Sequence, residues 1–171
     1  MDQIAPLILT LTFDERSFAF FEAQRRRFFP PGRNLIPAHL TLFHKLPGEH
    51  LDPIARDIEA QALAQRPFSL EVTGLRSLGR GVAYTLSSPE VASLREGLTQ
   101  RWETWLGSQD LQKHQPHVTV QNKVEPQEAK ALLSELTAAF EPFTATGVGL
   151  DLWWYRGGPW EKARGFSFAD A

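Results

Sequence analysis

The sequence predicts an α+β fold with mostly antiparallel sheets and helices on the outside, built from two related halves. Three observations support this prediction. Strand-like and helical segments follow one another in the order β-α-β-α and then β-β-α-β-α-β-β. Each half contains a helix, a proline-containing loop and then a strand that carries a His-x-Thr pattern. No low-complexity linker separates the halves, and because their identity is low outside this pattern, the duplication is inferred from the order of elements.

The first half opens with LILTLTF, an apolar and partly alternating segment that is typical of a strand. Asp14 follows it and is placed to cap a helix with aromatic residues on one face and arginines near its C-terminal end. Prolines and a glycine in 30–37 predict a loop, and a later helix ends near Pro67. The predicted elements are a strand over 7–13, a helix over 15–29, a strand over 38–46 and an amphipathic helix over 50–65.

The second half starts with a predicted hairpin around the glycines at 79 and 81. The helix after it begins at a Ser-Pro-Glu sequence and ends at Gly107. At the C-terminal end, two strands are joined through RGGPWEKARG (156–165). The predicted elements are strands over 68–75 and 81–88, a helix over 88–107, a strand over 117–124, a helix over 125–140 and two strands within 143–168.

Composition limits the possible classes of function. The 171 residues fit one domain, or one domain built from two halves, with a proper core. An apolar fraction of 42%, a charged fraction of 22% and a net charge of −2 are typical of a soluble globular protein. This charge balance argues against binding to long duplex nucleic acid, which needs a basic face, but allows a small pocket for one phosphate. The absence of cysteine excludes disulfides, thiolate zinc sites and cysteine nucleophiles.

The beginning of the chain, MDQIAPLILTLTFDE, has an acidic rather than a basic leader and only a short apolar run. This pattern predicts a first strand rather than a signal peptide or a membrane span. We therefore expect a cytoplasmic protein with no membrane partner.

The two His-x-Thr segments, PAHLTLFHKL and QPHVTVQNKV, place titratable side chains in an apolar, strand-like pattern. Successive side chains of a strand point to opposite faces, so each strand buries leucines or valines and presents its His-x-Thr pair on a stiff support. The presenting faces carry His39, Thr41, Phe43 and Lys45 in the first strand and His117, Thr119, Gln121 and Lys123 in the second. The opposite faces carry Leu40, Leu42 and His44 in the first and Val118, Val120 and Asn122 in the second.

Two such strands facing each other across a cleft would bring together two imidazoles and two hydroxyls, a set that suits a phosphodiester. A neutral histidine can act as the general base and a protonated one can supply the proton to the departing oxygen. Both forms coexist near neutrality because the unperturbed pKa of histidine is about 6.5. Threonine hydroxyls can donate to the non-bridging oxygens, where negative charge develops. This chemistry requires no metal.

The segments HLTL (39–42) and HVTV (117–120) resemble the paired signature of the 2H phosphoesterase superfamily, which includes the 2′-5′ RNA ligase-like proteins. LWWYRGGPWE (152–161) also looks like the tail of bacterial members, so the resemblance covers essentially the whole chain. It implies that residues 1–171 form one bilobal domain with two intertwined lobes, two mostly antiparallel sheets and a pseudo-two-fold cleft. It also implies metal-independent chemistry on 2′,3′-cyclic phosphates or related RNA ends, without a cofactor. The acid/base pair would be His39 and His117, and the phosphate contacts would be Thr41 and Thr119.

Further substrate contacts follow from position alone. Lys45 and Lys123 have matched offsets from the two histidines, and they either help to bind an anion or are solvated residues at strand ends. Phe13, at the end of the first strand, and Arg156, before a Gly-Gly turn, are predicted contacts at the edge of the cleft. The aromatic cluster could stack a base, but adjacent strand residues face opposite ways, so at most half of it can line the cleft. Its members are Trp153, Trp154, Tyr155 and Trp160.

Other interpretations compete with these assignments. Taken singly, either histidine could be half-buried and satisfied by a carbonyl, and either threonine could be a simple strand former. A metal site is disfavoured because strand alternation places His44 opposite His39 and Pro116 interrupts the spacing of the later histidines. The basic run near the end of the first helix usually serves the helix dipole and solubility. The potential metal ligands are His39, His44 and His50, or His114 and His117, and the basic run is Arg25, Arg26 and Arg27.

The sequence therefore predicts a metal-independent phosphoesterase that opens a 2′,3′-cyclic phosphate by two-histidine catalysis. Its expected ligand is a small cyclic nucleotide or an RNA end with a terminal phosphate, and we expect a monomer. One alternative is reversible ligation or cleavage of a 2′-5′ RNA linkage, which uses the same groups in reverse. The other is a non-catalytic protein that binds nucleotides or RNA ends.

Overall fold

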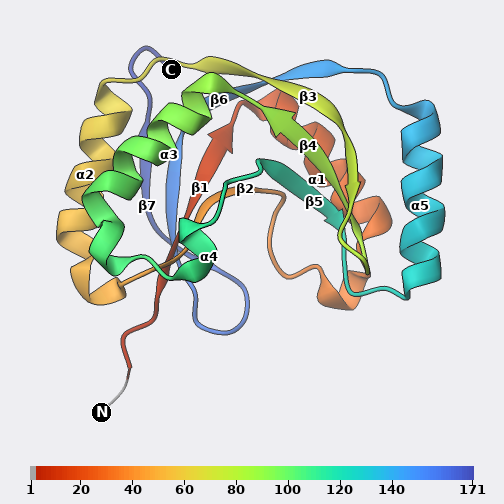
Figure 1. Ribbon diagram of the computed structural model, residues 1–171, viewed down its shortest axis with the longest axis horizontal. Helices are drawn as coiled ribbons and strands as arrows, with labels where there is room; N and C mark the ends of the chain where they lie inside the picture. Colours follow the sequence, from red (N-terminus) through yellow and green to blue (C-terminus); the bar gives the residue numbers. More distant parts are fainter. Residues whose placement is uncertain (1–2) are drawn as a thin grey trace.

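The computed structural model describes residues 3–171, and the first two residues of the predicted acidic leader lie outside the described residues. The structure contains a seven-stranded sheet in which every pairing is antiparallel, with helices packed around it (Figure 1). The α+β class and the predicted order of the main helices and strands are confirmed. The strands are β1 (Leu7–Phe13), β2 (Leu40–Leu46), β3 (Phe68–Ser77), β4 (Val82–Ser87), β5 (His117–Gln121), β6 (Phe143–Trp154) and β7 (Glu161–Ser167). The α-helices are α1 (Glu15–Phe28), α2 (Leu51–Leu63), α3 (Pro89–Trp102), α4 (Ser108–Leu111) and α5 (Pro126–Ala139).

The strands form one continuous sheet, where two had been predicted, because β6 is long enough to serve both halves. The sheet order is β2-β1-β6-β3-β4-β5, and β7 also pairs with β6. The first part of β6, Phe143–Gly147, pairs with β3, and its later part pairs with β7 on Gly149–Trp154. On its other edge, β6 pairs with β1. Each half thus contributes its strands to one shared ladder.

The sheet curls strongly enough to bring its two ends together. β2 and β5 are the first and last strands of the sheet order, yet they contact each other. Figure 1 shows both strands near the middle of the molecule. Since β2 and β5 are the strands with the His-x-Thr patterns, this curvature brings the two patterned strands into contact.

Helices cover both halves of the sheet. α1 packs against β1 and β5, α5 packs against β3 and β4, and α2 packs against α3, β6 and β7. Asp14 caps α1 as predicted, since its side chain accepts a hydrogen bond from the backbone N–H of Ser17 at 3.3 Å. Ser88 caps α3 in the same way, accepting from the N–H of Val91 at 3.2 Å. Within residues 3–171, none of the helices is long and apolar enough to cross a membrane.

Both motif strands contain a β-bulge directly after the threonine. In β2, Thr41 and Phe43 pair with consecutive residues of β1, so Leu42 is the extra residue. In β5, Thr119 and Gln121 pair with consecutive residues of β4. A bulge shifts the side chains beyond it relative to regular alternation. The bulges occupy the same place in both strands, which supports the predicted duplication.

The bulges correct the predicted faces of the motif strands. Phe43 and Gln121 were expected beside the catalytic residues, but they are buried, with exposed fractions of 0% and 3%. His44 was expected to face away from His39, but its side chain is 39% exposed, and Lys45 is exposed next to it. Strand alternation therefore holds from each histidine to its threonine and fails after it.

Gly81 is required where the start of β4 approaches the end of β5. A Cβ atom at this position would overlap the carbonyl oxygen of Gln121 and lie 2.6 Å from the Cα of Asn122. We expect Gly81→Ala to lower the free energy of unfolding by about 1–3 kcal/mol because a rigid backbone must move. Urea denaturation followed by tryptophan fluorescence measures this loss.

Gly32→Ala is the matched control. Gly32 is exposed, no heavy atom lies within 4 Å of its added Cβ, and its φ is outside the left-handed region. We expect a change within about 0.5 kcal/mol, as at other unconstrained surface positions. Equal losses at both glycines would contradict this account of Gly81.

Candidate active site

The two motif histidines are held by the same local hydrogen bond. His39, which was predicted to lie within a strand over 38–46, directly precedes β2, and His117 is the first residue of β5. The Nδ1 atom of His39 lies 2.8 Å from the carbonyl oxygen of Pro37. The Nδ1 atom of His117 lies 2.8 Å from the carbonyl oxygen of Gln115. A carbonyl only accepts, so Nδ1–H donates in both rings and each Nε2 is left to exchange a proton with a substrate.

Burial is the main influence on the pKa of both rings. It lowers the pKa of His39 to about 4, against the opposing effect of the Pro37 carbonyl. The positive charges of Arg25, His117 and His44 lower it further. Burial also lowers the pKa of His117, opposed by the carbonyl of Gln115. The free protein therefore favours neutral imidazoles, and a bound phosphate anion would favour their protonation.

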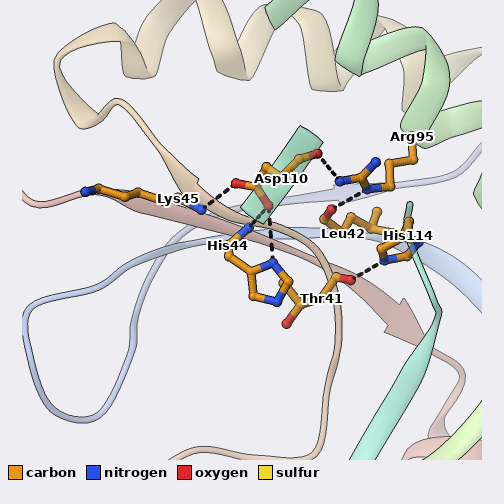
Figure 2. Close-up of polar contacts among 7 residues, drawn as sticks. All are labelled: Thr41, Leu42, His44, Lys45, Arg95, Asp110 and His114. Atoms are coloured by element: carbon orange, nitrogen blue, oxygen red, sulfur yellow. Dashed lines mark hydrogen bonds and ion pairs between the residues drawn. The ribbon is translucent and has the colours of Figure 1, made fainter. Parts of the chain in front are cut away.

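Each motif threonine lies two residues beyond its histidine. Its backbone carbonyl accepts a hydrogen bond from a side chain in the other half of the chain. Thr41 and Thr119 are both half-buried. The carbonyl of Thr41 accepts a hydrogen bond from Nε2 of His114 at 2.8 Å (Figure 2). The carbonyl of Thr119 accepts from Nη1 of Arg25 at 2.9 Å. These hydrogen bonds give partners to backbone carbonyls at the edges of the two end strands, and they help to hold both threonine backbones in place.

His39 and Thr119 line a hollow of about 320 Å³, called here the His39 hollow. Its cationic lining residues are Arg25, Arg33 and Lys123, and its aromatic ones are Phe29, Tyr155 and Trp160. No aspartate or glutamate from the described residues lines it. The ring of Trp160 packs 4.6 Å from that of His39, measured between centroids. Such a hollow suits an anion joined to a flat ring.

The other predicted contact residues are spread over several places. Lys123 lines the His39 hollow from a left-handed turn with a φ of 64°. Phe13 is buried, packs on Phe21, and borders a neighbouring hollow of about 420 Å³ that also includes His39. Lys45 lines a separate hollow with His44, and Arg156 pairs with Glu161 at 2.9 Å outside the lining of the His39 hollow. The alternation that placed Lys45 beside His39 is broken by the bulge.

The predicted aromatic cluster is divided between packing and the hollow. Tyr155 and Trp160 line the His39 hollow. Trp153 instead donates a hydrogen bond from Nε1 to Oγ1 of Thr10 at 2.9 Å. Trp154 lies partly buried against the core. Part of the cluster therefore lines the cleft and the rest is used in packing.

Arg25 is a site residue that the sequence analysis assigned to the helix dipole and solubility. It is 3% exposed and donates to Oδ1 of Asn34 at 2.7 Å, to the carbonyl of Ile36 at 3.1 Å and to Thr119. Burial lowers its pKa to about 10, partly offset by Glu22, so it stays protonated at neutral pH. One pattern could have identified it: the buried face of α1 repeats every four residues through Ser17, Phe21 and Arg25.

Two partly buried histidines, His39 and His114, predict that acid destabilises the fold. Burial lowers the pKa of His114 to about 4, as for His39, although the carbonyl of Thr41 opposes it. The unfolded chain takes up these protons near pH 6.5 and the folded chain near pH 4. The unfolded state therefore binds more protons between those values, and the free energy of unfolding falls as the pH falls through this window. We expect a loss of about 1–3 kcal/mol per histidine, measured by urea denaturation at a series of pH values.

His114→Gln tests the assignment, because a glutamine amide can still donate to Thr41 but does not titrate. We expect a shallower dependence on pH in this variant. An unchanged slope, or stability that rises toward pH 4, would contradict the assignment.

The described residues 3–171 contain no group of three or more histidine, aspartate or glutamate side chains arranged to hold a metal ion. The bulge leaves His44 exposed, but four of the histidines bind carbonyl oxygens or a carboxylate through one ring nitrogen. What these residues offer is a pair of matched imidazoles, two threonines and a cationic hollow.

Known proteins are similar to this chain in sequence family and in fold. The family model of the 2′-5′ RNA ligase superfamily matches residues 13–159. The crystal structure of TT0787 of Thermus thermophilus is similar, with a TM-score of 0.64, 18% identity, and coverage of 95% of this chain and 97% of that chain. The E. coli LigT structure complexed with 3′-AMP has a TM-score of 0.61 and 15% identity, covering 98% of this chain and 100% of that chain. These likenesses show a shared fold, and the comparison with curated proteins gives no significant match.

Proposed function

Because the chain belongs to the 2′-5′ RNA ligase superfamily, we propose that it is a metal-independent phosphoesterase that hydrolyses a 2′,3′-cyclic phosphate. The observation that carries the proposal is the matched hydrogen bonding of His39 and His117. Each ring donates Nδ1–H to the carbonyl two residues before it, at 2.8 Å in both cases. Two imidazoles with free Nε2 atoms are the minimum equipment for moving two protons in one displacement.

In the proposed reaction, one neutral imidazole takes a proton from water through Nε2 while the water oxygen bonds to phosphorus. The other imidazole, protonated, donates its Nε2 proton to the ribose oxygen whose bond to phosphorus breaks. The product is a phosphate monoester with a free neighbouring hydroxyl. The two histidines end with exchanged protonation states and are reset by proton exchange with solvent. The carbonyls of Pro37 and Gln115 stabilise whichever ring is charged.

Thr41 and Thr119 are proposed to donate hydrogen bonds to the non-bridging phosphate oxygens. The hydrogen bonds from His114 and Arg25 hold the two threonine backbones in place, so the hydroxyls need little reorganisation during the reaction. The His39 hollow supplies Arg25, Arg33 and Lys123 for the charge and aromatic rings for a base. The crystals of E. coli LigT with 3′-AMP support a nucleotide as a ligand for this fold.

The experiment is incubation with a panel of 2′,3′-cyclic nucleotides and short RNAs with cyclic-phosphate ends, in excess EDTA. Products are separated as 2′- and 3′-phosphates. We expect turnover in chelator to a single isomer, which reveals the ribose oxygen that leaves. Turnover only of a 2′-5′ linkage would favour the ligase or cleavage alternative. Nucleotide binding without any turnover would replace the proposal with a binding function, and turnover abolished by EDTA would contradict its metal independence.

A further inference from the structure

A third histidine, His44, is joined to a buried carboxylate beside the two motif strands. Its Nδ1 atom lies 3.2 Å from Oδ1 of Asp110 (Figure 2). Asp110 belongs to the short helix α4, which the sequence analysis did not predict, and it is 1% exposed. The same carboxylate accepts hydrogen bonds from the backbone N–H groups of His44 at 2.8 Å and Lys45 at 2.9 Å. It thus binds the outer edge of β2 and orients the His44 ring.

Asp110 is held as a charged acceptor. Burial opposes its ionisation, but the hydrogen bonds from the His44 ring and from the amides of His44 and Lys45 keep its pKa below the usual value. Arg95 adds support by donating to the carbonyl of Asp110 and to that of Leu42 in β2. Because this carboxylate accepts from Nδ1–H, the Nε2 atom of His44 points away from Asp110 and is the ring atom that can bind a ligand.

The ring of His44 projects from β2 in a different direction from the side chain of Lys45, as Figure 2 shows. The charge of protonated His44 contributes to lowering the pKa of both His39 and His117, so it acts on both rings of the pair. The two hydrogen bonds from backbone N–H groups are enough for Asp110 to hold β2 in place. The imidazole of His44 is exposed and is not needed for that role, so it is available to bind a ligand.

A second hollow lies beyond His44, and a substrate could extend into it. This hollow of about 920 Å³ is lined by His44, Lys45, Trp105 and Glu49 among others. Tyr155 lines both it and the His39 hollow, so the two adjoin. A nucleotide chain whose end occupies the His39 hollow can therefore extend past Tyr155 into the second hollow, where it meets His44.

We infer that His44, oriented by Asp110, binds a second phosphate of the substrate, one nucleotide away from the phosphate that reacts. This inference rests on the proposed function and makes it more specific. It identifies the preferred substrate class as an RNA end that carries a further phosphodiester or a 5′-phosphate, rather than a bare cyclic nucleoside phosphate. His44 is then a specificity residue, and Asp110 is a positioning residue that acts through it.

Three substrates separate the contribution of the second phosphate from that of a second nucleoside. They are uridine 2′,3′-cyclic phosphate, its 5′-phosphorylated form, and the dinucleotide UpU with a 2′,3′-cyclic phosphate end. We expect the intact protein to show about tenfold higher kcat/KM on the two substrates with a second phosphate, mainly through KM, as one charge-assisted hydrogen bond provides. His44→Gln is expected to reduce this preference to less than about twofold. Lys130→Gln, which removes a positive charge from the exposed face of α5, is the control and should keep the preference.

Asp110→Asn provides a second variant, with folding checked by urea denaturation. It should reduce the preference through KM, while its single amide oxygen still accepts from one of the two backbone N–H groups of β2. Equal losses on all three substrates in His44→Gln, or no preference in the intact protein, would overturn the inference and leave the proposed function standing. A preference for UpU alone would show binding of the second nucleoside rather than the phosphate, which also overturns it. Failure of the intact protein on every substrate would overturn both.

Discussion

Replacing either His39 or His117 with alanine is expected to lower kcat on a 2′,3′-cyclic nucleotide by about 10²–10⁴-fold, the range that general acid–base catalysis contributes. Each ring is assigned one of the two proton transfers, and a methyl group can perform neither. Nucleotide affinity should fall much less, because Arg25, Arg33, Lys123 and the aromatic rings of the His39 hollow remain. Steady-state kinetics and equilibrium binding of a product monophosphate measure the two effects separately.

The double variant sharpens this prediction. If the two imidazoles act in one displacement, removing both should cost little more than removing one. His50→Ala is the control, because this histidine stacks on Trp105 at 4.5 Å and has no part in the proposed proton transfers. A loss below about tenfold in either single variant, or losses that multiply in the double variant, would contradict the paired mechanism.

Arg25→Met is expected to lower the free energy of unfolding by about 2–4 kcal/mol and kcat/KM by more than about tenfold. The guanidinium donates to three acceptors, one of them the carbonyl of Thr119 in β5. A methionine fills the space but leaves these buried acceptors without a donor, at about 1–3 kcal/mol for each one that water does not reach. It also removes the bond by which α1 positions Thr119, together with one cation of the His39 hollow.

Arg26→Met separates this effect from a simple loss of charge, because Arg26 is the next residue of α1 and is exposed. Its stability should change by less than about 0.5 kcal/mol. Denaturation curves and cyclic-nucleotide turnover for both variants test the prediction. Similar behaviour of the two variants would show that Arg25 contributes only charge, and the proposed link between α1 and Thr119 would be wrong.

The elements were predictable where the pattern is local. Alternation indicated β1, the Asp14 cap indicated the start of α1, and the glycines near 80 indicated the hairpin of β3 and β4. Joining all strands into one sheet depends on the pairing of β6 with β3, β1 and β7, which no local pattern encodes. The short α4 escaped prediction because four residues carry too little periodicity to identify a helix.

The candidate site was predictable up to the threonines and not beyond them. His39 and Thr41, like His117 and Thr119, follow regular alternation, so their shared face could be inferred from spacing. The bulges that follow reverse the expected places of Phe43 and His44, and a bulge is set by strand pairing rather than by the strand's own sequence. Arg25, Asp110 and His114 act on strands from the other half of the chain, and only the curled sheet brings them there.

The most direct test of the two-histidine mechanism is the pH dependence of kcat/KM on a cyclic nucleotide in excess EDTA, for the intact protein and both single variants. The intact protein should give a bell-shaped profile, whose two pKa values belong to the pair. Its maximum should lie below about pH 6.5, since burial lowers the pKa of both rings in the free protein. The residual activity of the variant that lacks the general base should give a profile without the acidic limb. The variant that lacks the general acid should give a profile without the alkaline limb. A profile that is flat, or that keeps both limbs in both variants, would contradict the assignment of His39 and His117 as the acid/base pair.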